Sequence, residues 1–317
     1  MTSETYKKDK VKKITSTTTP KMIEKILLAV SGLGHAEEML KALAELPSMR
    51  MAKVNVLHVV PSQTTSETMT AKWEEGGKIL ANAIMSLKLD PAQVSSILRQ
   101  GDPKDVVCQV ADEIDADLII MGSRGLKRLE SILSNSVSQY VFQLSSRPML
   151  LVKDDIYVKK IKRIMVAMDA SDAAENCLKL ALFLLRDSKE QVELILANVN
   201  TEWASRRSKE SALTLEKSPV LSKGIAIARQ YGIEPRCVVS TGGEGQEGFL
   251  TNSGRAGEEI CRLAQENNVD LLLIGSPDRR PNIAKSFVDL DKLLGSSLSD
   301  YIRVNASCPV LLARTAA

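Results

Sequence analysis

The sequence predicts an α/β protein with two domains in tandem, each a doubly wound, five-stranded parallel sheet covered by helices. Three observations predict this class. The length of 317 residues is about twice that of a typical domain. Four segments recur in the same order in the two halves of the chain. Short continuous apolar runs alternate with amphipathic stretches, as in repeated strand–helix units.

The repeat can be followed residue by residue. The first match is KILLAVS at residues 25–31, which recurs as RIMVAMD at residues 163–169. Three more pairs follow in order: 54–59 with 194–199, 117–123 with 270–276, and 147–153 with 308–314. The spacing between the copies widens along the chain, so the second copy carries insertions before and after its fourth strand. Four ordered matches indicate a duplication.

The matched segments are the predicted strands, because continuous apolar runs are typical of strands buried on both faces. Helix-start signals lie between them. Asp102 followed by Pro103 predicts a capped helix, and Asp172 with Glu175 fits the spacing of a capping box. Each half is therefore expected to have five strands and about four helices, connected by right-handed crossovers.

The predicted domains cover residues 23–155 and 160–317, with a short charged connector between them. Residues 1–22 form a predicted flexible basic tail, which has no apolar segment of the kind found in signal peptides. No apolar run is long enough to span a bilayer. We therefore expect a cytoplasmic protein without a membrane partner.

Composition excludes several further classes. The net charge is only +3 and aromatic residues make up 3% of the chain, which argues against a nucleic-acid partner. The five cysteines are isolated in sequence and indicate buried thiols rather than a disulfide framework or a zinc site. Only two histidines are present, His35 and His58, so a histidine-rich metal site is excluded. His58 lies inside an apolar strand and is interpreted as a core histidine.

A ligand is expected outside the carboxyl ends of the parallel strands, where the strand order reverses. The loop after the fourth strand carries the strongest signal, with Gly122 and Gly125 followed by Asn135 and Ser136 at the start of a helix. Glycines let the backbone approach a phosphate, and a helix N-terminus favours an anion. Ser136 either donates its hydroxyl to a ligand or caps the helix.

These segments resemble the signature of the universal stress protein family, in its tandem form. The resemblance rests on residues 117–125, 136–140 and 148–152, and it extends over nearly all of both halves, excluding the tail and the insertions. It implies a Rossmann-like fold of the adenine nucleotide α-hydrolase type. It also implies a G-x2-G-x9-G-[ST] nucleotide loop, an Asp at the end of the first strand, and a backbone contact to adenine after the second strand.

Each half departs from this pattern in its own way. In the first half Val59, Gly122, Gly125 and Ser136 match, whereas Ser31 replaces the Asp and Asn135 replaces the last Gly. In the second half the matching residues are Asp169, Val199, Gly275, Gly295 and Ser296, with Ser297 beside them. There Asp278 replaces the second Gly, and the loop is longer than in the first half. The eleven matching or replaced positions other than Asp278, together with Ser297, are the twelve candidate nucleotide-binding residues, and two equal sites are not expected.

The resemblance implies a stress-response sensor or regulator that binds ATP or another adenine nucleotide, with or without Mg²⁺. One alternative is an interaction scaffold that has lost nucleotide binding. A third is a weak ATP hydrolase or phosphotransferase in which Asp169 helps to hold a metal–phosphate group. No general base is evident, so an enzyme is the least favoured reading.

The resemblance also implies that the two halves form a pseudo-dimer within one chain, pairing residues 148–152 with 309–312. Pairing would cover an apolar edge strand that is otherwise an aggregation hazard. Association of two such chains into a homodimer is left open. The run Gly243–Gly248 formally matches a dinucleotide motif, but it falls after the third strand and is interpreted as an expanded mobile loop.

Overall fold

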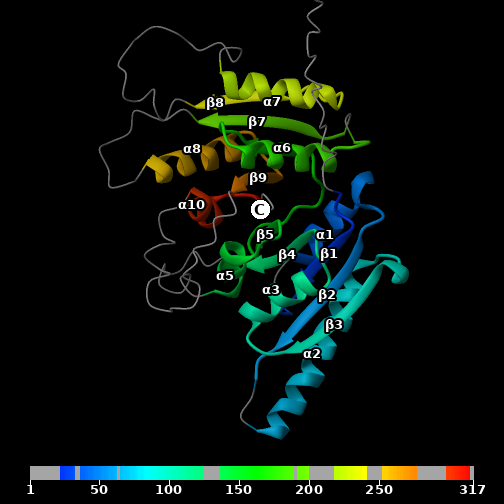
Figure 1. Cartoon of the computed structure of the whole chain (residues 1–317). Helices are drawn as coiled ribbons and strands as arrows, with labels where there is room; N and C mark the ends of the chain where they lie inside the picture. Colours follow the sequence, from blue (N-terminus) through cyan, green and yellow to red (C-terminus); the bar gives the residue numbers. More distant parts are fainter. Residues whose placement is uncertain are drawn as a thin grey trace, which may run out of the picture.

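The structure is a computed structural model that describes residues 22–32, 36–62, 65–123, 136–188, 191–199, 218–240, 252–276 and 298–314. In helix α8 the side chains of residues 252–255 are outside this description. The predicted N-terminal tail and the Gly243–Gly248 loop also lie outside the described residues. Both halves contain the elements expected from the repeat (Figure 1).

The first half contains five strands and, within the described residues, four α-helices. The strands are β1 (Lys25–Ala29), β2 (Lys53–Val60), β3 (Val94–Gln100), β4 (Leu118–Ser123) and β5 (Met149–Lys153). The helices are α1 (Ala36–Ala44), α2 (Ser66–Leu87), α3 (Pro103–Glu113) and α5 (Val137–Leu144).

The second half repeats this order. Its strands are β6 (Arg163–Ala167), β7 (Glu193–Val199), β8 (Arg236–Ser240), β9 (Leu271–Ser276) and β10 (Val310–Arg314). Its described helices are α6 (Asp172–Leu184), α7 (Pro219–Gln230), α8 (Asn252–Glu266) and α10 (Leu298–Asn305). The prediction of two tandem α/β units is confirmed.

The strands form one ten-stranded sheet in the order β3-β2-β1-β4-β5-β10-β9-β6-β7-β8 (Figure 1). All neighbours within a half are parallel, and the strand order reverses between β1 and β4 and between β6 and β9. Helices α1, α2, α6 and α7 pack on one face, and α3, α5, α8 and α10 pack on the other. The sheet is therefore doubly wound, and its strands are buried on both faces as the continuous apolar runs predict.

The two halves meet through an antiparallel pairing of β5 with β10, which places Leu150 opposite Leu311. This confirms the predicted pairing of the last strands and removes two apolar edges from solvent. Polar contacts reinforce it reciprocally. Lys153 Nζ, at the end of β5, donates to the carbonyls of Val304 and Ala306 near the end of α10, both at 2.6 Å.

The counterpart of this contact involves Arg314 at the end of β10. Its Nη2 donates to the carbonyls of Phe142 and Gln143 in α5, at 2.6 and 3.0 Å, and its Nη1 donates to Ser276 Oγ at 3.0 Å. Each half thus uses a basic residue from its last strand to satisfy carbonyls at the end of the other half's last helix.

Helix starts agree with the sequence in two cases and differ in a third. Asp102 caps α3 by accepting from Lys104 N, with Pro103 in the first turn, as predicted. Ser136 caps α5 by accepting from Gln139 N at 3.2 Å. The capping box at Asp172 is wrong, because Ser171 caps α6 by accepting from Ala174 N. The preceding Asp169 carboxylate accepts from the backbone N–H of Ser171.

Candidate functional site

A cavity of about 550 Å³ opens at the carboxyl ends of β1, β2 and β4 in the first half. This is the point at which the strand order reverses, where open α/β sheets bind ligands. The starts of α1, α3 and α5 and one side of α2 complete its wall. Its volume lies within the range of about 300–1,000 Å³ that is usual for small-molecule sites.

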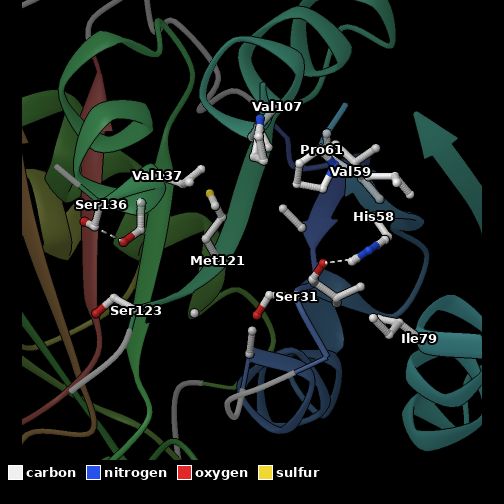
Figure 2. A pocket seen from close by; sticks show the side chains of 18 of the residues that line it. Ser31, His58, Val59, Pro61, Ile79, Val107, Met121, Ser123, Ser136 and Val137 are labelled. Atoms are coloured by element: carbon white, nitrogen blue, oxygen red, sulfur yellow. Dashed lines mark hydrogen bonds between the residues drawn. The ribbon is translucent and has the colours of Figure 1, made fainter. Parts of the chain in front are cut away.

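One side of the cavity is apolar. Figure 2 shows Val59 near the end of β2 and Pro61 just after it next to Val107 from α3, with Ile79 of α2 close to His58. Val59 and Val107 are 8% and 2% exposed, so both are held firmly by the core beneath them. These side chains form an apolar surface of the kind on which a flat heteroaromatic ring is buried.

The other side carries hydroxyl groups. Ser31 follows β1, Ser123 ends β4, and Ser136 begins α5, and Figure 2 shows all three around the same side of the cavity. Gly122 lies between Met121 and Ser123 in this wall. Hydroxyls beside a helix N-terminus are donors suited to a phosphate or another anion.

His58 differs from its expected role as a core histidine. Its ring is half-buried, and Nδ1 lies 2.8 Å from the carbonyl oxygen of Val30. A carbonyl only accepts, so Nδ1 donates this hydrogen bond. The ring lines the cavity (Figure 2). Gly76 makes room for it, since a Cβ there would lie 2.9 Å from His58 Cδ2.

Charged groups also reach the cavity from several elements. Lys72 and Glu75 of α2 form an ion pair at 2.6 Å, and this contact lowers the pKa of Glu75. Glu37 of α1 and Asp154 after β5 contribute carboxylates. Arg303, from α10 of the second half, contributes a guanidinium. Among the described residues, no group of three or more His, Cys, Asp or Glu is placed to hold a metal ion.

The second half uses the equivalent positions differently. Asp169 is exposed, and its Oδ1 accepts from Ser171 N at 2.8 Å and from Ser171 Oγ at 2.5 Å. Val199 ends β7 and is half-buried. Gly275 near the end of β9 lies against the start of α6, where an added Cβ would overlap the backbone of Ala173 and Ala174. A glycine is therefore required here by helix packing.

The structure thus brings four predicted residues together around one cavity: Ser31, Val59, Gly122 and Ser136. The predicted Gly125 and Asn135 lie outside the described residues, as do the second-half residues Gly295, Ser296 and Ser297. The sequence reading missed Arg303. The alignment of the two repeats carries a signal for it, because an arginine, Arg303, stands in the second repeat where the first has an apolar residue, Phe142.

Comparison with known proteins establishes the family. A model of the universal stress protein family matches residues 22–153 and again residues 160–314. The chain belongs to this family. Over 148 residues the chain is 30% identical to the universal stress protein YxiE of Bacillus subtilis. This match covers 42% of the chain and all of YxiE.

A solved structure agrees with the fold of this universal stress protein. The crystal structure of a universal stress protein from Archaeoglobus fulgidus is 18% identical and covers 92% of this chain and 97% of that chain, with a TM-score of 0.66. A family member from Arabidopsis thaliana, determined with AMP bound, covers 49% of this chain and 93% of its own at 15% identity, with a TM-score of 0.33. None of the described helices of the present protein is long and apolar enough to cross a membrane.

Proposed function

We propose that this universal stress protein binds an adenine nucleotide in the cavity of its first half and acts in the cytoplasm as a stress-response sensor or regulator. The observation that carries the proposal is the cavity itself. It lies at the reversal point of strand order, and four residues predicted from the nucleotide-binding pattern of the family line it.

The two sides of the cavity suit the two ends of a nucleotide. The adenine ring fits the apolar side, beside Val59 near the end of β2 and Pro61 just after it. The phosphates fit the side formed by Ser31, Ser123 and Ser136, next to the N-terminus of α5.

The first half is favoured over the second as the binding half. The loss of the strand-one carboxylate at Ser31 removes a negative charge from beside the proposed phosphate position, which favours an anionic ligand. In the second half the Asp169 carboxylate keeps that charge and is bound by Ser171. A ligand there would compete with Ser171 for the Asp169 carboxylate.

Direct binding tests the proposal. The purified protein is denatured and the supernatant is analysed for released nucleotide, and the nucleotide-free protein is titrated with ATP and AMP by calorimetry. The expected result is one adenine nucleotide bound per chain. Absence of both released nucleotide and binding heat would reject the proposal and favour an interaction scaffold.

A matched pair of variants locates the site. Ser31→Phe introduces a ring into the cavity from an exposed position and should abolish binding, whereas Asp169→Phe at the equivalent second-half position should leave it intact. Loss of binding in Asp169→Phe alone would move the site to the second half. Circular dichroism of both variants confirms that each remains folded.

A further inference from the structure

The second half contributes a buried cation to the cavity of the first half. Arg303 lies on α10, and its side chain is 7% exposed, yet it lines the cavity between the ends of β1, β2 and β4. It is the only cavity-lining residue among those described that comes from the second half. Burial of a cationic side chain at such a place requires compensation by an anion or by several hydrogen bonds.

The described protein groups supply little of that compensation. Arg303 forms an ion pair with Asp300, with Nε and Oδ1 3.4 Å apart, and no hydrogen bond from its Nη1 or Nη2 to another described residue is present. The contrast with Arg314 at the same interface is informative. Arg314 donates to two carbonyls and one hydroxyl through its terminal nitrogens. The terminal nitrogens of Arg303 are left available for a ligand.

The guanidinium is held in place from the first half. Gln143 Nε2 of α5 donates to Asp300 Oδ1 at 2.9 Å, which fixes the carboxylate that pairs with Arg303. Lys153 holds the end of the same helix through the carbonyls of Val304 and Ala306. Burial lowers the pKa of Arg303 and Asp300 opposes this, but an arginine stays charged at any physiological pH.

The cavity of the first half therefore has a cation that comes from the second half. The carboxylates of Glu37 and Asp154 also reach this cavity, so an anion bound there needs a compensating positive charge close by. A guanidinium with two adjacent free N–H groups is well suited to phosphate oxygens, which it contacts in a bidentate manner.

At the two aligned positions in α5 and α10, only the second half carries a cation. In the repeat, the sequences of helices α5 and α10 align residue for residue. Tyr140 is equivalent to Tyr301, and Phe142 is equivalent to Arg303. Phe142 is 1% exposed and has no charge to offer the second half. The duplication has thus given one half a charged residue that serves the other.

We propose that Arg303 is a phosphate-binding residue of the first-half site, so that the second half of the chain completes the site and selects nucleotides over nucleosides. The proposal rests on the proposed function, because it assigns a residue to the same cavity. It adds that neither half alone forms the whole phosphate-binding surface.

Calorimetric titration of the full-length protein with AMP, ATP and adenosine tests it. Arg303→Met keeps an unbranched apolar stem and removes the guanidinium, and it should weaken AMP and ATP binding by about 10- to 100-fold. Adenosine, which lacks phosphate, should bind wild type and variant equally. Arg303→Lys should recover part of the lost affinity. Arg229→Met, on the exposed surface of α7, is the matched control and should change nothing.

The outcomes separate the two proposals. Equal AMP and ATP affinities in wild type and Arg303→Met would overturn the role of Arg303 while leaving nucleotide binding in place. A parallel loss of adenosine affinity would mean that Arg303 only supports the structure, and would also overturn it. Binding that survives Ser31→Phe would place the ligand elsewhere and overturn it again. No binding of any of the three compounds by wild type would overturn both proposals.

Discussion

At the carboxyl end of strand β1 the first half has Ser31, which lines a cavity, whereas at the end of β6 the second half has Asp169, whose carboxylate binds the turn that starts α6. The last helix of each half shows the same kind of difference. Phe142 of α5 is part of the core, whereas Arg303 of α10 reaches the cavity of the other half. After a duplication, equivalent positions in the two copies can take different roles. In the first half the end of the first strand lines a cavity, whereas in the second half it binds the start of the next helix.

Among substitutions that test the difference between the halves, we expect the largest loss of stability at Gly275, where the second half packs β9 against the start of α6. Gly275→Ala places a methyl group onto the backbone of Ala173 and Ala174, which cannot move without displacing α6. We expect a loss of about 3 kcal/mol in the free energy of unfolding, at the upper end for overpacked sites. Urea denaturation followed by circular dichroism measures the loss, and hydrogen exchange should place the earliest opening in the second half.

Gly77→Ala is the matched control for Gly275→Ala. Gly77 lies within α2, and an added Cβ there meets no atom within 4 Å. Helix propensity then predicts that alanine stabilises the protein by about 1 kcal/mol. If both glycine variants were equally stable, the close approach of α6 to β9 would be contradicted.

Much of this arrangement can be predicted from sequence. Continuous apolar runs and the four matched segments predict the strands of both halves, the helices between them and the carboxyl edge of the sheet, since these depend on local pattern. Ser31, Val59, Gly122 and Ser136 were found because they belong to segments with a recognisable local motif. The capping residue of α6 was missed by one position, because Ser171 and Asp172 are both good caps and the choice depends on a hydrogen bond from Ser171 to Asp169.

Arg303 was missed for a different reason. Its position at the first-half cavity depends on the antiparallel pairing of β5 with β10, which joins residues far apart in sequence. Local pattern gives no information on such a contact. Comparing the repeats position by position would have shown an arginine opposite a buried phenylalanine, which is the kind of mismatch that indicates a specialised role.

The two basic residues that join the halves, Lys153 and Arg314, test whether the two sides of the interface contribute equally to stability. Arg314→Met removes three donated hydrogen bonds, two of them to the last turn of α5, and should cost about 2 kcal/mol. Lys153→Met removes two such bonds and should cost about 1 kcal/mol, because the desolvation of the ammonium offsets part of their benefit. Urea denaturation of both variants at pH 7 measures the difference. Equal losses would indicate a symmetric interface.

The pH dependence of stability distinguishes Lys153 further. Burial lowers its pKa in the folded protein, so between that value and the ordinary lysine pKa of about 10.4 the unfolded chain binds more protons. Stability therefore rises with pH in this window for wild type relative to Lys153→Met. A difference between the two that stays constant between pH 8 and pH 10 would show that the ammonium is not destabilised by burial.

The smallest effect is expected at the ends of the first strands. Asp169→Ala removes two hydrogen bonds to Ser171 at an exposed position, while Ser171 keeps its cap on α6, so the loss should be about 0.5–1 kcal/mol. Ser31→Ala should change stability by less than about 0.5 kcal/mol, which is usual for exposed positions. Thermal unfolding of the two variants side by side measures the difference. If Asp169→Ala left stability unchanged but weakened ATP binding, Asp169 would be a ligand contact rather than a structural group, and the two halves would be more alike than their geometry indicates.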